Sequence, residues 1–272
     1  MASGSTFNFV QVRLQSRYGQ RADERVWLSL YNTLDLASYL HTAQQTPLRS
    51  WLLGIDAEHT VHEVELALRQ KYRNHVDEVA GWLPAEWQPS FHWIKYLHDL
   101  PVLRYLLDGG RPQRWMKTDP ALSNFITDDV SERMQAMRRS GCGCLVTAWQ
   151  QGKPMLLAWL DQWEKLWPGN NDHEVGMRLL TRYLRARLLK EKQSYYQGVD
   201  IGNSVIGEDS EALTADMAVM FRRYAFQPAA VGAYLAIIAS DLLRIRSDLM
   251  QRLLFPGTVS LNGEGLAEVG LQ

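Results

Sequence analysis

The sequence holds little that would support catalysis, export or a disulfide framework. Its 272 residues include only two cysteines, Cys142 and Cys144, which fit a reducing cytosol better than a disulfide-rich secreted domain. The phosphate-binding pattern G-x-x-x-x-G-K, the dinucleotide pattern G-x-G-x-x-G and the nucleophile pattern G-x-S-x-G do not occur. No pair of carboxylates stands out for acid–base work. We therefore expect a protein that is not an enzyme and uses no cofactor.

Charge and long apolar runs are also scarce. The formal net charge is −1, which argues against a general nucleic-acid binder, because neutralising phosphates requires a clear excess of Lys and Arg. The opening MASGSTFNFVQVR has neither a basic nor an apolar signal region, so no signal peptide is expected. No apolar run approaches the roughly 18 residues of a membrane span. We expect a cytoplasmic protein that could act only at the periphery of a membrane.

The clearest helical pattern lies between Pro228 and Pro256. Apolar residues there recur every three or four positions, as on one face of a helix: Val231, Tyr234, Leu235, Ile238, Leu242, Ile245, Leu249 and Leu253. The opposite face carries four polar residues: Asp241, Arg244, Asp248 and Gln251. Arg244 with Asp248, and Asp248 with Arg252, are i,i+4 neighbours that could pair. The pattern predicts a helix over residues 228–254 whose apolar face, including Leu242 and Ile245, packs against helices from the N-terminal half.

Helical patterns dominate the rest of the chain as well. Thr60 and Glu63 form a capping box for a helix that ends near Gly81. A further helix is expected over residues 90–107, with a break at Pro101, and later ones at about 129–140, 153–167, 173–196 and 210–225. Residues 7–14 fit either a strand or the start of a helix. Since no convincing β alternation occurs, we predict an all-α fold of about ten helices in stacked bundles.

Turn residues indicate how this helical chain is divided. The run Asp108-Gly109-Gly110-Arg111-Pro112 is the plainest boundary, and residues 111–124 after it resemble an exposed connection. We therefore predict an N-terminal helical region over residues 1–110 and a C-terminal region over 111–256 packed on it. The Gly-rich residues 257–272 are expected to form a flexible tail.

Two small groups of residues could support metal or redox chemistry. His59 and His62 begin a helix, but a zinc site needs three or four suitably spaced ligands, so a surface location is the simpler interpretation. Cys142 and Cys144 lack the two-residue gap of thioredoxin-like motifs, and two small buried thiols at a helix junction account for them. A regulatory disulfide is the remaining alternative. Trp159, Trp163 and Trp167 follow an i,i+4,i+8 stripe that is typical of a packing seam.

The helix expected over residues 173–196 is rich in basic residues, and Arg178, Arg182 and Arg185 fall on one of its faces. A solvated face would account for them, because long basic side chains cover apolar neighbours while their charges stay in water. The functional interpretation is a contact with an acidic protein partner or anionic headgroups. An internal alternative is pairing with acidic residues of a later loop: Glu208, Asp209 and Glu211.

Three stretches resemble a known family. The first comprises residues 9–13 (FVQVR), 36–40 (LASYL) and 46–48 (TPL), and the second is residues 96–107 (YLHDLPVLRYLL). The third is residues 231–235 (VGAYL), followed by Asp241 and Arg246. Together they resemble the C-subunit family of archaeal and bacterial A/V-type rotary ATPases, whose eukaryotic members are called d. The chain departs from the family pattern at Gln11, at Pro101 and at residues 239–241, and it is shorter than family members.

The resemblance implies a funnel- or wedge-shaped, all-helical protein without catalysis. In that family the protein seats the central stalk of the rotor on the membrane ring, so the implied partners are stalk and ring subunits. The first competing hypothesis is a cytosolic helical interaction module unrelated to any ATPase. The second is a helical metal or redox protein that uses His59 and His62 or the two cysteines.

Overall fold

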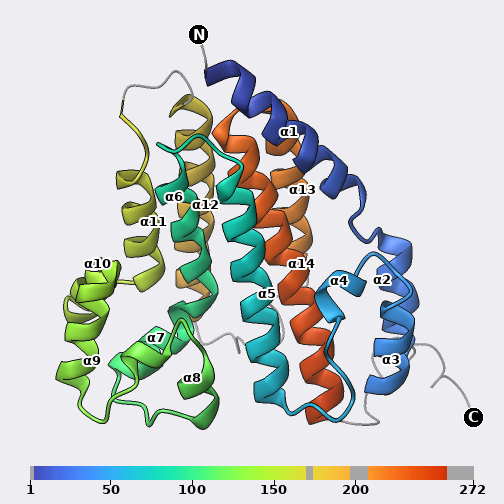
Figure 1. The fold of residues 1–272 in the computed structure, drawn as a ribbon, viewed down its shortest axis with the longest axis horizontal. Coiled ribbons are helices and arrows are strands. Elements are labelled where there is room, and N and C mark those ends of the chain that lie inside the picture. The colour runs from blue at the N-terminus through green and yellow to red at the C-terminus, as the bar shows by residue number, and fades with distance from the viewer. Residues whose placement is uncertain (1–2, 170–173, 197–207, 256–272) are drawn as a thin grey trace, which may run out of the picture. The chain divides into compact units, whose positions relative to one another are not determined.

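The predicted all-α fold is confirmed by the structure, which is a computed structural model. It describes residues 3–169, 174–196 and 208–255, with side chains described over 7–169, 175–187 and 211–255. In the described part, eleven helices have eight residues or more and no strand occurs (Figure 1). Residues 7–14 belong to helix α1 (Ser3–Gly19). The expected tail, residues 257–272, lies outside the described residues.

The chain packs into two compact units that do not follow the order of the sequence. Unit 1 comprises Met1–Gln15 and Arg69–Ser240, and unit 2 comprises Ser16–Leu68 and Asp241–Gln272. Three helices run from one unit into the other: α1, α5 (Val61–Gly81) and α14 (Pro228–Leu254). Because these long helices belong to both units, the division does not fall at the turn of residues 108–112.

Unit 1 contains all the α-helices that the structure describes between α5 and α14. In order they are α6 (Gln88–Trp93), α7 (Leu100–Leu107), α8 (Arg114–Thr118), α9 (Val130–Met137), α10 (Gly143–Gln150), α11 (Met155–Lys165), α12 (Glu174–Tyr196) and α13 (Glu208–Arg223). The single helix expected over residues 90–107 is wrong in detail, because a 3-10 segment, Ile94–Asp99, separates α6 from α7. Pro101 lies in the first turn of α7, where a missing amide hydrogen costs nothing.

The first half of α14 lies in the core of unit 1. Nearly every side chain from Ala229 to Ala239 is buried, so this half is enclosed on all sides rather than on one face. Close approach of α12 requires glycine on both helices. A Cβ at Gly232 would lie 2.7 Å from Leu180 Cδ2, and one at Gly176 would lie 2.9 Å from Ala229 Cβ. The tryptophan stripe packs in this unit as predicted, with the Trp159 and Trp163 ring centroids 5.8 Å apart.

Unit 2 combines short capped helices with the second half of α14. Asp23 caps α2 (Glu24–Tyr31) and Asp35 caps α3 (Leu36–Ala43) by accepting hydrogen bonds from backbone amides, which satisfies otherwise unpaired donors. A third short helix, α4 (Arg49–Leu52), follows. The predicted capping box is confirmed, since Thr60 N donates to Glu63 Oε2 at 2.8 Å and Glu63 N donates to Thr60 Oγ1 at 3.4 Å.

The apolar face predicted for the second half of α14 is confirmed, because Leu242, Ile245 and Leu249 are buried. The polar face differs from the expected i,i+4 pairing. Asp241 accepts two hydrogen bonds from Arg21, at 2.6 and 2.7 Å, and Arg244 pairs with Glu24. The polar residues of this half therefore hold α14 to the turn before α2 and to α2 itself.

Candidate functional site

The structure separates the three arginines that the sequence places on one face of α12. Arg178 and Arg182 are exposed, whereas Arg185 is partly buried. Arg185 Nη1 lies 2.7 Å from Asp161 Oδ1 and its Nη2 lies 3.2 Å from Glu164 Oε1, both on α11. The side chains of Glu208 and Asp209, the proposed internal partners, lie outside the described part of the chain. Arg185 therefore joins α12 to α11, and the exposed basic residues of the stripe are Arg178 and Arg182.

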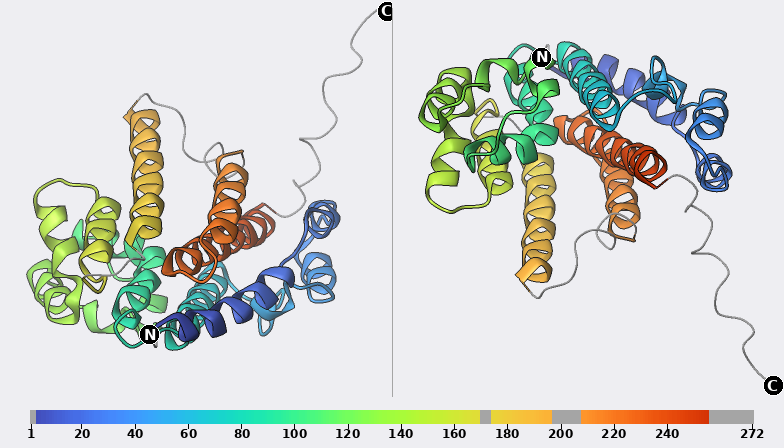
Figure 2. Two further views of the ribbon diagram at one scale, coloured as in Figure 1. Left: turned by 90° about the horizontal axis from the view of Figure 1, so that it is seen from above. Right: turned by 90° about the horizontal axis from the view of Figure 1, so that it is seen from below.

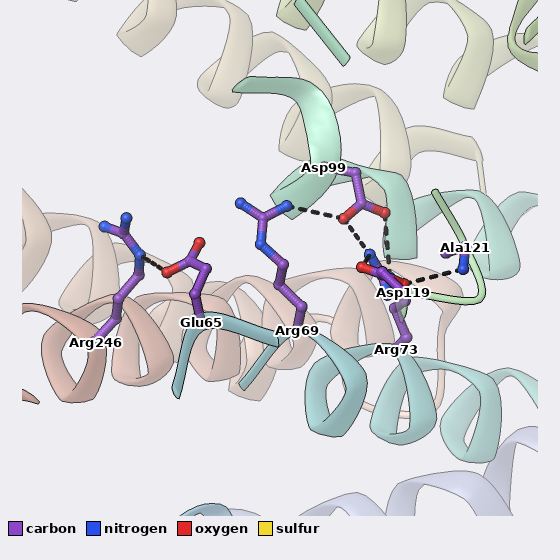
Figure 3. Close-up of polar contacts among 7 residues, drawn as sticks. All are labelled: Glu65, Arg69, Arg73, Asp99, Asp119, Ala121 and Arg246. Carbon is purple, nitrogen blue, oxygen red and sulfur yellow. Dashed lines mark hydrogen bonds and ion pairs between the residues drawn. The ribbon is translucent and has the colours of Figure 1, made fainter. Parts of the chain in front are cut away.

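Four buried charged residues of unit 1 form a cluster that the sequence analysis did not identify. Arg73 donates to Asp99 Oδ1 at 2.5 Å and to Asp119 Oδ1 at 2.7 Å, as Figure 3 shows. Arg69 adds a hydrogen bond to Asp99 at 3.2 Å. All four side chains are buried, and Asp119 also accepts a hydrogen bond from the Ala121 amide at 3.0 Å. We call Arg69, Arg73, Asp99 and Asp119 the Arg–Asp cluster.

Three segments position the Arg–Asp cluster. Arg69 and Arg73 lie four residues apart on α5, so their side chains share one side of the helix. Asp99 closes the 3-10 segment before α7, and Asp119 follows α8 directly. The interpretation of residues 111–124 as an exposed connection is only partly correct, because Met116, Asp119 and Leu122 in it are buried while most of its other residues are exposed. The cluster ties this segment to α5.

The electrostatics of the Arg–Asp cluster indicate a structural role. Burial raises the pKa of Asp99 above its ordinary value, although the hydrogen bonds and charge of Arg73 oppose that rise. Burial also disfavours the charged form of Arg73, but hydrogen bonds to Asp119 and Asp99 outweigh it and raise the pKa of the guanidinium. Bidentate pairing of this kind fixes geometry as well as charge. The charges hold one another in place within the core.

Aromatic and thiol groups near this cluster are poor candidates for reactive groups. Tyr72 is fully buried next to it, and burial raises the pKa of its hydroxyl. Burial likewise raises the pKa of Cys142 to about 11 and that of Tyr96 to about 12. Cys142 is buried and Cys144 is partly buried at the start of α10, which is the expected helix junction. Since the thiolate is the reactive form, these environments favour inert thiols.

The histidines that begin α5 lie at the surface. His59 Nδ1 is 2.6 Å from Asp56 Oδ1, in a partly exposed pair, and Thr60 separates it from the helix. Over the described residues, no group of three or more His, Cys, Asp and Glu side chains is arranged to hold a metal ion. The neighbouring acid Glu63 has a lowered pKa because the Thr60 amide donates to it. This end of α5 is organised by capping.

Unit 2 also buries charge, but on the side of α14 that the sequence predicts to be polar. Arg252 donates to the carbonyl oxygens of Leu30 and Thr33, at 3.1 and 2.9 Å, and its guanidinium carbon lies 4.4 Å from the centre of the Tyr39 ring. Tyr39 in turn donates to Asp248 Oδ2 at 3.2 Å. Burial raises the pKa of Asp248, against the opposing charge of Arg252. These contacts hold α14 to α2 and α3.

A second pair in unit 2 joins α14 to the start of α5. Arg246 Nε donates to Glu65 Oε2 at 2.5 Å (Figure 3). Glu65 is nearly buried, whereas about half of the Arg246 side chain remains accessible. The exposure of the arginine reduces what this pair adds to stability. Its role is to fix the register of α14 in unit 2.

One described helix, α14, is long and apolar enough to cross a membrane, with a mean hydropathy of 1.4 over its best window. This differs from the expectation that no apolar stretch approaches that length. However, 78% of that window is buried within the structure. A core helix passes the same test, so the finding is weak evidence for a membrane span.

The comparisons with known proteins add no assignment to this geometry. No family model, curated protein or solved structure matches the chain, so its resemblance to the C-subunit family of the rotary ATPases stays a prediction.

Proposed function

We propose that this chain is a non-catalytic helical coupling or adaptor protein, of the kind that seats the stalk of a rotary ATPase on its membrane ring. Its partners would be proteins, stalk and ring subunits among them, and its location cytoplasmic at the inner face of a membrane. The specific family rests on the resemblance of residues 9–13, 96–107 and 231–235. The broader role rests on the structure of unit 1.

The observation that carries the broader role is the Arg–Asp cluster. Buried ionisable groups in an enzyme are usually arranged to change protonation or to meet a substrate. Here Arg69, Arg73, Asp99 and Asp119 pair with one another across segments of unit 1. Closed pairing of this kind rigidifies a helical body. A coupling part needs that rigidity and large helical faces, and it needs no titrating site.

Purification under native conditions tests the proposal. The tagged full-length chain, expressed in its source cells, should sediment with membranes and co-purify with ATPase subunits in defined stoichiometry. Genes for other ATPase subunits should lie beside its own. Purified by itself, the chain should neither hydrolyse ATP nor bind it tightly. A micromolar dissociation constant for ATP with magnesium, measured by calorimetry, would contradict the proposal.

The same purification separates the alternative hypotheses. A stable complex with soluble proteins other than ATPase subunits would favour an unrelated cytosolic interaction module. Stoichiometric metal in the purified chain, or a Cys142–Cys144 disulfide found by mass spectrometry, would favour a metal or redox protein. Each outcome replaces the rotary ATPase assignment with another function.

A further inference from the structure

The face of unit 1 that carries the exposed arginines of α12 also carries exposed apolar side chains. Val175 is 66% exposed and Leu179 is 38% exposed on α12, and Val219 is 53% exposed on α13. On α12, Val175 and Leu179 lie four positions apart, as do Arg178 and Arg182, so each pair lies along one side of the helix. On α13, Arg223 follows Val219 at the same spacing. We call the exposed residues of this surface the α12–α13 face: Val175, Arg178, Leu179, Arg182, Val219 and Arg223.

The two helices of the α12–α13 face are neighbours that run in opposite directions. Tyr183 of α12 donates a hydrogen bond to Asp216 of α13, and a Cβ at Gly176 would lie 2.9 Å from Tyr224 Cδ1, just after α13. Leu179 and Val219 each fall between these two contacts. Figure 2 shows α12 in yellow and α13 in orange, both projecting on the same side of unit 1.

This surface is locally basic in a chain of net charge −1. Over their full length α12 and α13 carry eight basic and six acidic residues, and the α12–α13 face itself has three arginines, at positions 178, 182 and 223, and no acid. Arg185 is neutralised by Asp161 and Glu164, and Asp216 already accepts the Tyr183 hydroxyl. Positive charge beside exposed apolar area is complementary to an acidic, amphipathic ligand.

We propose that the α12–α13 face binds an amphipathic helix of a partner protein that presents carboxylates around an apolar stripe. The apolar stripe would cover Val175, Leu179 and Val219, because amphipathic helices bind by laying such a stripe on an apolar surface. The carboxylates would meet Arg182 and Arg223. This inference deepens the proposed function and rests on it, since it names the chemistry of one partner of the coupling protein.

The type of basic residue favours a protein partner over a membrane surface. The basic residues of the α12–α13 face itself, Arg178, Arg182 and Arg223, are all arginines, and the two lysines of α12, Lys190 and Lys192, are not among the residues of this face. The planar guanidinium pairs with a carboxylate through two parallel hydrogen bonds, and arginine is enriched at protein interfaces whereas lysine is depleted. A membrane surface would be bound through charge with little preference for this geometry.

Two synthetic peptides test the proposal with the full-length chain. Both carry leucine at helical i,i+3,i+4,i+7 spacing, and the remaining positions are glutamate in one peptide and lysine in the other. Fluorescence anisotropy should show that the acidic peptide binds at least about tenfold more tightly than the basic one. Its affinity should fall as salt is raised, because exposed charges are screened.

Variants identify the surface. Arg182→Glu combined with Arg223→Glu should weaken binding of the acidic peptide by about tenfold or more and leave the melting temperature nearly unchanged. Leu179→Ser combined with Val219→Ser should also weaken it, which a purely electrostatic contact would not show. Arg104→Glu is the matched control, because Arg104 is an exposed arginine of α7 in the same unit, and it should bind as the wild type does.

Four outcomes would overturn the proposal. Equal binding of the two peptides would show that charge does not determine which helix binds. Unchanged binding by the double arginine variant would show that the peptide binds elsewhere than the α12–α13 face. A lowered melting temperature with unchanged binding would show that the arginines are paired within the chain. Binding to vesicles of phosphatidylglycerol and phosphatidylcholine, without binding of the acidic peptide, would assign the face to a membrane.

The peptide result is independent of the wider function. The acidic peptide could bind at the α12–α13 face of a chain that co-purifies with no ATPase subunit. That result would support the binding site and contradict the rotary ATPase proposal. The opposite result is also possible: the double arginine variant still co-purifies with ATPase subunits and the acidic peptide does not bind. That result would support the proposed function and contradict the binding site on the α12–α13 face.

Discussion

Two buried arginines, one in each unit, are satisfied by different chemistry. Arg73 in unit 1 is 7% exposed and donates to the carboxylates of Asp99 and Asp119. Arg252 in unit 2 is 3% exposed, but its hydrogen bonds go to the side chain of Thr33 and to main-chain oxygens of Leu30, Thr33 and Asp248. Arg73 is therefore held by opposite charge, and Arg252 mainly by backbone dipoles.

This difference determines how much folding free energy each unit loses when one member of a buried polar contact is removed. Removing a carboxylate from a buried ion pair leaves an uncompensated charge in the core. Removing an arginine that binds carbonyls takes a donor mainly from neutral acceptors, and each lost hydrogen bond of this kind costs less. We therefore expect unit 1 to be more sensitive than unit 2 to the loss of a single polar side chain.

The largest effect is expected for Asp99→Ala, which removes the carboxylate shared by Arg69 and Arg73. It should lower the free energy of unfolding by about 3–5 kcal/mol, because it leaves buried charge without its full compensation. Urea unfolding followed by tryptophan fluorescence measures the change. Asp128→Ala removes an exposed carboxylate of the same unit and should change little. A loss as small as that of the control would mean that the Arg–Asp cluster does not stabilise unit 1.

The next largest effect is expected in the apolar face of α14 in unit 2. Ile245 is fully buried and Leu242 nearly so, so replacing either by Ala should cost about 2–5 kcal/mol through lost transfer energy and the cavity left behind. Leu243→Ala is the matched control, since Leu243 is 42% exposed. If Ile245→Ala costs no more than Leu243→Ala, the stripe does not form the core of unit 2.

The sequence predicts the apolar framework well, because periodicity reports burial directly. The expected helix over residues 228–254 is α14, and the Thr60–Glu63 box caps α5 at the expected position. Both signals are local: the first needs only the spacing of apolar residues, and the second only two side chains three positions apart.

The Arg–Asp cluster was missed because its partners are not local. Asp119 lies 46 residues from Arg73, in a Pro- and Gly-flanked segment whose composition is typical of exposed loops. One signal was present: Arg69 and Arg73 directly follow Leu68 and Tyr72, which belong to the apolar face of the same helix. Arginines beside an apolar face need a partner or a route to water, but sequence alone does not say which.

The polar side of α14 was misjudged for a similar reason. Arg244, Asp248 and Arg252 have the spacing of i,i+4 pairs, which is the arrangement expected on a solvated helix. In unit 2 their partners are Glu24, Tyr39 and the end of α2. Helical spacing shows which residues share a face, but tertiary packing decides whether that face meets water or another helix.

A smaller effect is expected for the arginines that bind carbonyls. Arg252→Met keeps the apolar stem but removes the hydrogen bonds that the guanidinium donates to the carbonyls of Leu30 and Thr33, which should cost about 1–3 kcal/mol. Arg133 provides the same test in unit 1, because it donates to the carbonyls of Leu106, Gly110 and Thr127. Arg133→Met should lose a similar amount, measured by urea unfolding. If Arg133→Met instead loses as much stability as Asp99→Ala, the difference in sensitivity depends on which unit the residue belongs to, and not on whether its partner is a carboxylate or a carbonyl.

The smallest effect separates charge from hydrogen bonding within unit 2. Asp248→Asn keeps an acceptor for the Tyr39 hydroxyl and removes only the charge, so the change at neutral pH should stay within about 1 kcal/mol. The wild type should differ from the variant in its pH dependence. Burial raises the pKa of Asp248 in the folded protein above its ordinary value of 3.8, so between these two pKa values the folded state binds more protons than the unfolded state.

The sign of the pH effect follows from that difference. The stability of the wild type relative to Asp248→Asn should fall as pH rises through the folded pKa and should be recovered as pH falls towards 3.8. The measurement is urea unfolding of both proteins at a series of pH values from about 4 to 7. The charges that face Asp248, namely Arg252 and Arg244, limit the size of the change because they favour the carboxylate. A wild type that gains stability over the variant as pH rises would show that these arginines, and not burial, dominate the environment of Asp248, and unit 2 would then depend on a buried ion pair as unit 1 does.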